Sequence, residues 1–465
     1  MVYNLKRRIY EKSPLALKQA LCLLPFSWYG GRAYRNVYRR GIWFDIASRE
    51  EVLSYQEQQL SKILQFAVDQ VPAYKHLRSV VERHSPFEAL SAFPLLEKDA
   101  VQVNQHEYLP RDFKMMPHYE TTTGGTSGSQ LKIYLDDDSQ SVEMGFIHRL
   151  WKQVGYTSRD RKATFRGVAF PNLESGIFWQ RNPIYNELQF SPFHMSETNL
   201  GSYISQMIRF KPSYIEAYPS ALDVLAEYML RHDLTRELPS IKAALLGSEG
   251  LSSAQRERIE RAFQTRVYSW YGHSERLVLA GECEENSTYH HLPDYGILEI
   301  VDDNGYPCDR EGELGEIVGT GLFNRCMPLI RYRTGDYATR LEYRCECGRN
   351  WDRFTDVEGR WRQDMVIGKS GARISVAALN MHGTLFEKVR RFQYYQDTAG
   401  ICILKVMPTL GFAHRELLEI EAAYRAKIGN ELQFKVVVVD EIPLTARGKL
   451  KMVDSRLNSN TTASC

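Results

Sequence analysis

The sequence predicts an α/β protein with a large N-terminal region of layered α/β sheets plus a small β-barrel, followed by a small α+β domain. Two patterns lead to this prediction. Between residues 242 and 270, buried strand segments and a helical segment alternate with glycine turns, which is typical of α/β layers. From residue 296 to 340, short strands follow one another through Gly, Asn and Asp turns, which favours a mostly antiparallel barrel.

The individual elements follow from the spacing of apolar residues. Residues 50–70 are expected to form a helix, because their apolar positions recur about every 3.6 residues and Val71-Pro72 ends the pattern. Residues 242–246 are expected to form a buried strand. A helix over residues 252–263 and a strand over residues 266–270 are expected to follow.

The last hundred residues have the pattern of a separate compact unit. We expect a helix at 376–389, a strand at 401–406, a helix at 415–428 and a strand at 434–439. The expected division of the chain is a basic N-terminal arm (1–45), a large domain (46–362, with the barrel at about 296–358), a C-terminal domain (363–454) and a disordered polar tail (455–465).

Composition excludes several classes of protein. Of the 465 residues, 43% are hydrophobic and 25% are charged, as in ordinary soluble globular proteins. A formal net charge of +2 gives no general attraction to nucleic acid, so we expect no partner of that kind. No apolar run is long enough for a transmembrane helix, and the N-terminus lacks the pattern of a secretory signal. We therefore expect a cytoplasmic protein.

The N-terminal arm is strongly basic. Residues 1–40 contain nine Lys/Arg and one acid, Glu11, with tyrosine, leucine and tryptophan interleaved. This pattern suits a peripheral arm on the anionic surface of the inner membrane. The more ordinary interpretation is a basic helix that packs on the body of the protein and is solvated on its outer face.

Residues 121–129 (TTTGGTSGS) form a loop rich in hydroxyl groups and flexible backbone N–H groups, which is suited to cradle an anion. No lysine follows Gly128 as in a Walker loop, and position 129 is not the glycine of a nucleophile elbow. The ordinary alternative is a Gly/Ser-rich surface turn.

The segment 271–276 (YGHSER) follows an expected strand and carries a carboxylate, Glu275. A carboxylate beyond the carboxyl end of a strand is well placed to hold Mg²⁺ beside phosphate groups. Ser274 would then donate to an α-phosphate oxygen, and Tyr271 would offer its ring face to adenine. The alternative is a loop glutamate paired with Arg276.

Three further residues carry charge at turns. Asp336 closes the segment YRTGD, where a carboxylate is suited to accept both hydroxyls of a ribose. Arg360 offers a planar fork to ribose or phosphate. Lys449, on a glycine turn in PLTARGK, is suited to stabilise negative charge in a transition state. Taken singly, the first two have an ordinary surface ion pair as an alternative, and Lys449 an ordinary C-terminal lysine.

The cysteines suggest a metal more than disulfides, because no export signal is expected. Cys283, Cys345 and Cys347, with His290 or His291, form two short ligand pairs on separate loops. Together they would close a tetrahedral zinc site of three thiolates and one imidazole. Spacing favours His290 over His291. The alternative is free thiols in a reducing cytosol.

Five segments in this fixed order resemble the adenylate-forming (acyl-CoA synthetase/ligase) superfamily: 121–129, 271–276, 332–336, 359–364 (GRWRQD) and 443–449. FHMSE, KPSYIEAYPS, GSEG and FQYYQ are similar to the phenylacetate–CoA ligase family, and within it to the capsular-polysaccharide-biosynthesis (CapK-like) branch. The resemblance covers nearly the whole chain. Gln130 departs from the proline usual in the family. The 359–364 segment is one residue longer than the common pattern, which leaves Gln363 and Asp364 both open as the hinge.

The resemblance implies an ATP- and Mg²⁺-dependent ligase in which a carboxylic acid becomes an acyl-AMP and the C-terminal domain then rotates as a lid. The implied roles are pyrophosphate binding by Thr126, Ser127 and Gly128, adenine binding by Gly247, Ser248 and Glu249, α-phosphate binding by Ser274, Mg²⁺ binding by Glu275, ribose binding by Asp336 with Arg360, and catalysis of adenylation by Lys449. A structural zinc at the Cys/His group is also implied. We expect Tyr214, Ala217, Tyr218 and Pro219 to help line the acyl pocket.

The acceptor of the acyl group stays open at this stage. CoA, a carrier-protein pantetheine and an amino sugar all suit the same first half-reaction, and the CapK-like branch implies cell-surface polysaccharide biosynthesis. The alternative function is a non-catalytic nucleotide-binding or scaffold protein of a polysaccharide assembly complex. The altered loop and hinge favour that alternative, whereas the presence of Glu275, Asp336 and Lys449 opposes it.

Overall fold

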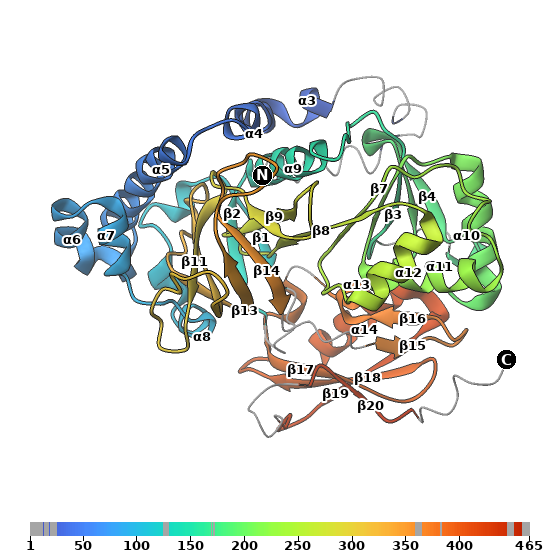
Figure 1. Ribbon diagram of the computed structural model, residues 1–465. Coiled ribbons are helices and arrows are strands. Elements are labelled where there is room, and N and C mark those ends of the chain that lie inside the picture. The colour runs from blue at the N-terminus through green and yellow to red at the C-terminus, as the bar shows by residue number, and fades with distance from the viewer. Residues whose placement is uncertain are drawn as a thin grey trace.

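The computed structural model describes residues 13, 18, 26–123, 130–168, 170, 173–358, 365–381, 384–443 and 451–457. The chain forms a large region built on one long sheet and a smaller C-terminal region that lies against its lower side in the view of Figure 1. Mixed α/β architecture with a C-terminal domain confirms the predicted fold class.

One end of the large sheet is mostly parallel. Its strands are β3 (Lys162–Phe165), β5 (Glu187–Phe190), β6 (Tyr214–Ala217), β7 (Ala243–Gly247) and β8 (Val267–Gly272), with β4 (Trp179–Asn182) antiparallel at the edge. Helices α10 (Glu197–Phe210), α11 (Pro219–Arg231) and α12 (Ser253–Phe263) lie beside these strands (Figure 1). All five residues of β7 are buried, as expected for a parallel strand between layers.

The predicted helices at 50–70 and 252–263 are confirmed. Helix α5 (Arg49–Gln70) and helix α12 each begin at a serine that forms a capping box with the residue three positions on. These caps satisfy backbone N–H groups that the first helical turn leaves without partners.

The other end of the sheet is antiparallel. After β8 the order continues through β9 (Leu279–Glu282), β10 (Tyr289–His291), β14 (Arg353–Glu358), β13 (Tyr332–Leu341), β12 (Leu314–Gly321) and β11 (Gly296–Val301). The short strands predicted between 296 and 340 are thus present. They extend the large sheet through the β8–β9 pair, and their closure into a separate barrel is not confirmed.

The C-terminal region is a four-stranded sheet with helix α14 (His414–Ile428). The strand order is β19 (Gln433–Val438), β18 (Ile401–Pro408), β17 (Val389–Thr398) and β20 (Val453–Ser455), and a β15–β16 hairpin (Met365–Ile367, Arg373–Ser375) precedes it. The predicted helix at 376–389 is wrong, because α13 spans only Val376–Leu379. Phe386 and Val389 are buried in the core of this region, so tertiary packing overrides the local helical pattern.

The N-terminal helices run along the upper edge of the molecule in Figure 1. Most of the predicted arm lies outside the described residues, but α3 (Phe26–Tyr29) and α4 (Gly31–Phe44) belong to it. Helix α4 packs on α9 (Ser139–Lys152), where an added Cβ at Gly145 would come within 3.0 Å of Val37. None of the described helices combines the length and apolar composition needed to cross a membrane.

Candidate functional site

The candidate site lies at the carboxyl ends of the parallel strands, where α/β sheets commonly bind ligands. A cleft of about 240 Å³ opens there. Its lining includes Ser248 and Glu249, which follow β7, Tyr271 and Gly272 at the end of β8, and Asp356 on β14. The structure therefore brings together the segments that were expected to bind adenine.

The turn after β7 is shaped by an aromatic neighbour. A Cβ at Gly247 would lie 2.4 Å from the Trp270 ring, so only glycine allows this close approach. Ser248 takes a left-handed backbone conformation with φ of 69° and accepts a hydrogen bond of 2.9 Å from Arg166.

Arg166 is a residue of this site that the sequence did not reveal. It follows β3, donates to the Gly247 carbonyl at 3.3 Å and lies 4.6 Å from the centre of the Tyr218 ring. One guanidinium thus links the expected adenine loop to the expected acyl pocket. Arg166 reaches this site because of the order of the strands in the sheet. A single sequence does not give that order.

Glu249 connects the large region to the C-terminal region. Its carboxylate accepts hydrogen bonds from the backbone N–H and the hydroxyl of Ser220, each at 3.0 Å, and a further bond from Ser375. Burial raises the pKa of Glu249. The contact with Ser375 crosses between the regions, as does that of Gln130, whose amide donates to Met381 O at 2.9 Å.

Glu275 is held by two hydrogen bonds in the turn after β8. Tyr332 donates to Oε1 at 2.9 Å, and His273 Nδ1 lies 3.2 Å from Oε2. His273 Nε2 accepts from the Val278 N–H, so Nδ1 carries the proton and donates to Glu275. Although burial alone would raise it, the hydrogen bond from His273 lowers the pKa of Glu275 to about 2. Glu275 is therefore ionised at neutral pH.

Asp336 and Glu275 are each bonded across the curl of the sheet, Asp336 by Tyr271 of β8 and Glu275 by Tyr332 of β13. Tyr271 on β8 donates to Asp336 on β13 at 3.0 Å, although these strands are not neighbours in the sheet order. A buried cluster that includes Ile317 and Phe354 fills the inside of the curl. Ser274, half-buried, occupies the turn beside Glu275.

The residues expected to line the acyl pocket divide into two groups. Ala217, Tyr218 and Pro219 lie where β6 passes into α11, beside Arg166 and the β7 turn. Tyr214 is the first residue of β6 and so lies at the end of the strand away from the cleft. There its hydroxyl donates to Val154 O at 3.0 Å. This position does not support a role for Tyr214 in the acyl pocket.

Several predicted site residues lie outside the described residues: Thr126, Ser127, Gly128, Arg360, Lys449 and the two hinge candidates, Gln363 and Asp364. Their roles stay predictions. The strands on either side of residues 124–129 along the chain, β1 (His118–Thr122) and β2 (Lys132–Asp136), form an antiparallel pair.

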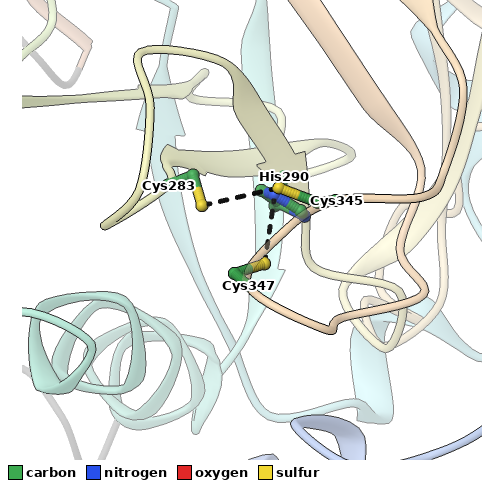
Figure 2. A group of neighbouring side chains, drawn as sticks. All are labelled: Cys283, His290, Cys345 and Cys347. Carbon is green, nitrogen blue, oxygen red and sulfur yellow. Dashed lines mark hydrogen bonds between the residues drawn. The ribbon is translucent and has the colours of Figure 1, made fainter.

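A second site is formed by Cys283, His290, Cys345 and Cys347, whose side chains point toward one another in Figure 2. Their four ligand atoms lie within 4.8 Å of one another. Cys283 Sγ is 3.8 Å from Cys345 Sγ, and Cys347 Sγ is 3.7 Å from His290 Nε2. Tetrahedral zinc requires ligand separations of about 3.5–3.8 Å, so the arrangement fits this ion.

The structure distinguishes the two histidines that the sequence left open. The ring nitrogens of His291 lie 3.2 and 2.9 Å from the backbone carbonyl oxygens of Leu279 and Gly296, and the ring N–H donates to one of these carbonyls, so His291 serves the fold. Burial lowers the pKa of His290 to about 3, which keeps its imidazole neutral as a metal ligand must be.

The thiols of this site are also perturbed by burial. Burial raises the pKa of Cys283 to about 12 and raises that of Cys347. At Cys345 burial acts in the same direction, but hydrogen bonds from the Cys347 backbone and from Asn286 outweigh it and lower the pKa. One thiol is thus already inclined to ionise.

Comparison with known proteins gives matches in both sequence and structure. Residues 366–456 match the CapK C-terminal domain family. Protein CapK of Staphylococcus aureus is 22% identical over 77% of this chain and 79% of that protein, and a phenylacetate–coenzyme A ligase of Thermus thermophilus is 25% identical over 73% and 75%. The solved structure of 2-hydroxyisobutyryl-CoA ligase with 2-HIB-AMP and CoA aligns with a TM-score of 0.55 and 17% identity, over 87% and 90% of the two chains.

These matches agree with one another. The chain is related in sequence to Protein CapK and to phenylacetate–CoA ligases over about three-quarters of its length, and it shares the fold of 2-hydroxyisobutyryl-CoA ligase. Its residues 366–456 match the CapK type of C-terminal domain.

Proposed function

We propose that the protein is an ATP-dependent carboxylate-activating ligase that forms an acyl-AMP and passes the acyl group to a thiol. One observation carries this proposal: Tyr271 lines the cleft at the end of β8 and donates to Asp336, and the ionised Glu275 follows four residues later in the turn after β8. Relatives named phenylacetate–coenzyme A ligase support the same reaction.

In the first half-reaction, a substrate carboxylate oxygen attacks the α-phosphorus of ATP, and the bond to pyrophosphate breaks. Glu275 would hold Mg²⁺, which neutralises charge on the phosphates. Asp336 would accept the ribose hydroxyls, and Ser274 would donate to an α-phosphate oxygen. Tyr332 and His273 keep Glu275 ionised and oriented for this task.

Two groups outside the described residues complete the proposal. Thr126, Ser127 and Gly128 would hold the departing pyrophosphate, and Lys449 would stabilise charge between the carboxylate and the α-phosphate. In the second half-reaction a thiol attacks the acyl carbonyl carbon, and AMP leaves. The C-terminal region contacts the large region through Ser375, which bonds to Glu249 in the cleft, and through Met381, which accepts from Gln130; these contacts suit a lid.

The acceptor and the biological setting form a finer part of the proposal. CoA is the acceptor most directly supported, because the phenylacetate–CoA ligases are relatives over some three-quarters of their own length. The match to Protein CapK supports a setting in cell-surface polysaccharide biosynthesis, where a carrier pantetheine or an amino sugar would serve as the acceptor.

We also propose a structural zinc ion at Cys283, His290, Cys345 and Cys347. The ligand separations and the neutral imidazole support this assignment. Since Cys283 and His290 belong to the β9–β10 hairpin and the other two ligands to the loop between β13 and β14, zinc would fasten strands of the curled sheet together.

Pyrophosphate release with a panel of short, aromatic, hydroxy and amino acids tests the proposed reaction, with mass spectrometry of the products after addition of CoA. We expect release with at least one acid and a CoA thioester from the same acid. Lys449→Ala should lower release by about 10²–10³-fold while ATP binding persists, because the lysine acts mainly in the transition state. ATP binding without release for any acid would favour the scaffold alternative.

A further inference from the structure

The outer face of helices α3 and α4 combines exposed apolar side chains with arginines. Trp28 is 70% exposed, Ile42 56% and Ile46, just beyond the helix, 81%. Arg32 and Arg39 are exposed as well. At 100° per residue, Arg32, Arg35, Arg39, Ile42 and Trp43 fall within about one third of the circumference of α4. They form a single stripe on the side away from the protein.

The inner face of the same helix is fully used for packing. Tyr34, Val37 and Phe44 are buried, and the space over Gly41 is filled by the side chain of Arg149. Arg40 turns inward and pairs with Asp294 at 2.8 Å. The helix is therefore firmly attached to the body, and its outer stripe is not needed to hold it there.

The charge of the stripe has one sign. Residues 26–44 contain four arginines and no acid. The next acid, Asp45, lies 3.3 Å from Arg349. A surface of exposed tryptophan and isoleucine between arginines, without carboxylates, complements a layer that is anionic at its surface and apolar beneath it.

We propose that the outer face of α3–α4 docks on the surface of an anionic phospholipid bilayer. The arginines would contact lipid phosphates, while Trp28, Ile42 and Ile46 enter the boundary between headgroups and acyl chains. Free phosphate or nucleic acid would satisfy the arginines alone, whereas a lipid layer also rewards burial of all three apolar side chains.

The orientation that results is compatible with a working site. In Figure 1, α3 and α4 lie along one edge of the molecule and the C-terminal region lies on the other side. Docking through α3–α4 would leave the contacts of the C-terminal region, at Glu249 and Gln130, away from the lipid. The protein would act as a peripheral enzyme whose C-terminal region faces away from the bilayer.

Co-sedimentation of the full chain with vesicles tests this proposal. We expect binding to phosphatidylglycerol-containing vesicles, much weaker binding to pure phosphatidylcholine, and a decrease with added salt. Arg32→Glu together with Arg39→Glu should lower the partition coefficient by about tenfold or more. Trp28→Ala with Ile46→Ala should also lower it, most clearly at high salt, where the apolar contribution remains.

The matched control is Arg310→Glu together with Arg415→Glu, which changes the net charge equally at two exposed arginines elsewhere. The partition coefficient of this control should lie within about twofold of that of the unchanged protein. A difference of that size is what the change in net charge alone would cause. Circular dichroism verifies the fold of every variant without reference to ligase activity. Equal binding of both charge variants, equal binding to both vesicle types, or binding to neither would overturn the proposal. Capture of an oligonucleotide by this face in place of vesicles would overturn it as well.

Discussion

Two buried groups of ionisable side chains lie on the same sheet and differ in how their polar atoms are satisfied. Around Glu275, hydrogen bonds from Tyr332 and His273 favour the charged form, and the pKa falls to about 2. Around Cys283 the thiols mainly contact one another and His290. Burial raises the pKa of Cys283 to about 12, and the buried His290 Nδ1 has no hydrogen-bond partner in the part of the chain that the structure describes.

This difference indicates what each group needs. A carboxylate that the protein itself stabilises is ready for a ligand without depending on one for its stability. Three crowded thiols with a neutral imidazole gain most from a cation that replaces their protons, because an unsatisfied buried polar group is costly. We therefore expect loss of the Cys/His group to damage the fold, and loss of the carboxylate to damage the reaction.

The largest effect is expected for Cys345→Ser. If the four side chains hold zinc, this change should remove most of the metal and lower the apparent unfolding temperature by on the order of 10 °C. Elemental analysis of the purified protein should find about one zinc per unchanged chain and far less in the variant. Removal of zinc with a strong chelator should reproduce the same loss of stability.

Cys308→Ser is the matched control for the cysteine variant. Cys308 is also buried and precedes β12 of the same sheet, but it lies outside the four-residue group. Its replacement should leave the zinc content unchanged. If both variants lose stability equally and neither unchanged protein nor control contains zinc, the two groups do not differ in the way proposed.

The opposite outcome is expected for Glu275→Gln. Glutamine keeps the size of the side chain and an acceptor for Tyr332, but it removes the charge that would hold Mg²⁺. Pyrophosphate release should fall by about 10²–10³-fold while zinc content is unchanged. Glu97→Gln, at a carboxylate whose side chain is 60% exposed, should retain release.

The pH dependence of stability adds a second test of Glu275. Its folded pKa of about 2 lies below the ordinary value of 4.5. The contribution of Glu275 to the free energy of unfolding is therefore complete above about pH 4.5 and is lost as pH falls toward 2. The unchanged protein should lose more stability across this window than Glu275→Gln does. Identical acid unfolding, together with full pyrophosphate release, would remove Glu275 from the site.

Local patterns in the sequence were sufficient for part of this structure. Helices with capping serines, such as the one at residues 252–263, were predictable because neighbouring residues determine them. The position of Glu275 after a strand was predictable for the same reason. Cys283, Cys345 and Cys347 were recognisable as a group from their spacing, since short pairs of Cys/His residues on separate turns are typical of metal sites.

Contacts between distant strands were not predictable from one sequence. The hydrogen bond between Tyr271 and Asp336, the role of Tyr332 and the position of Arg166 all depend on how the sheet curls and on its strand order. Spacing already favoured His290 over His291, and the structure adds which of the two side chains lies among the cysteines. The prediction for Tyr214 stays without support, because both ends of β6 carry a tyrosine and Tyr214 lies at the end away from the cleft.

The smallest effect is expected at a third buried ionisable group, the amine of Lys427. This amine differs from the other two groups, because no cluster of ionisable side chains surrounds it and few hydrogen bonds satisfy it. Lys427 on α14 donates to Asn380 O and lies 5.7 Å from the centre of the Phe193 ring. Burial lowers its pKa from 10.5 to about 8. An isolated amine of this kind can relieve its burial cost by releasing a proton, without any ligand.

The sign of the pH effect follows from that shift. Between pH 8 and 10.5 the unfolded chain binds a proton at Lys427 that the folded chain has released, so stability rises with pH through this window, and the full cost is present below about pH 8. Lys427→Met should flatten this rise and stabilise the protein at pH 7 by about 1–3 kcal/mol, less the hydrogen bond lost at Asn380. Lys435→Met, at an exposed lysine of β19, should leave the rise intact. If Lys427→Met instead destabilises the protein at every pH, the lysine has a partner that keeps it charged. Lys427 would then not differ from Glu275 and the Cys/His group in the way described.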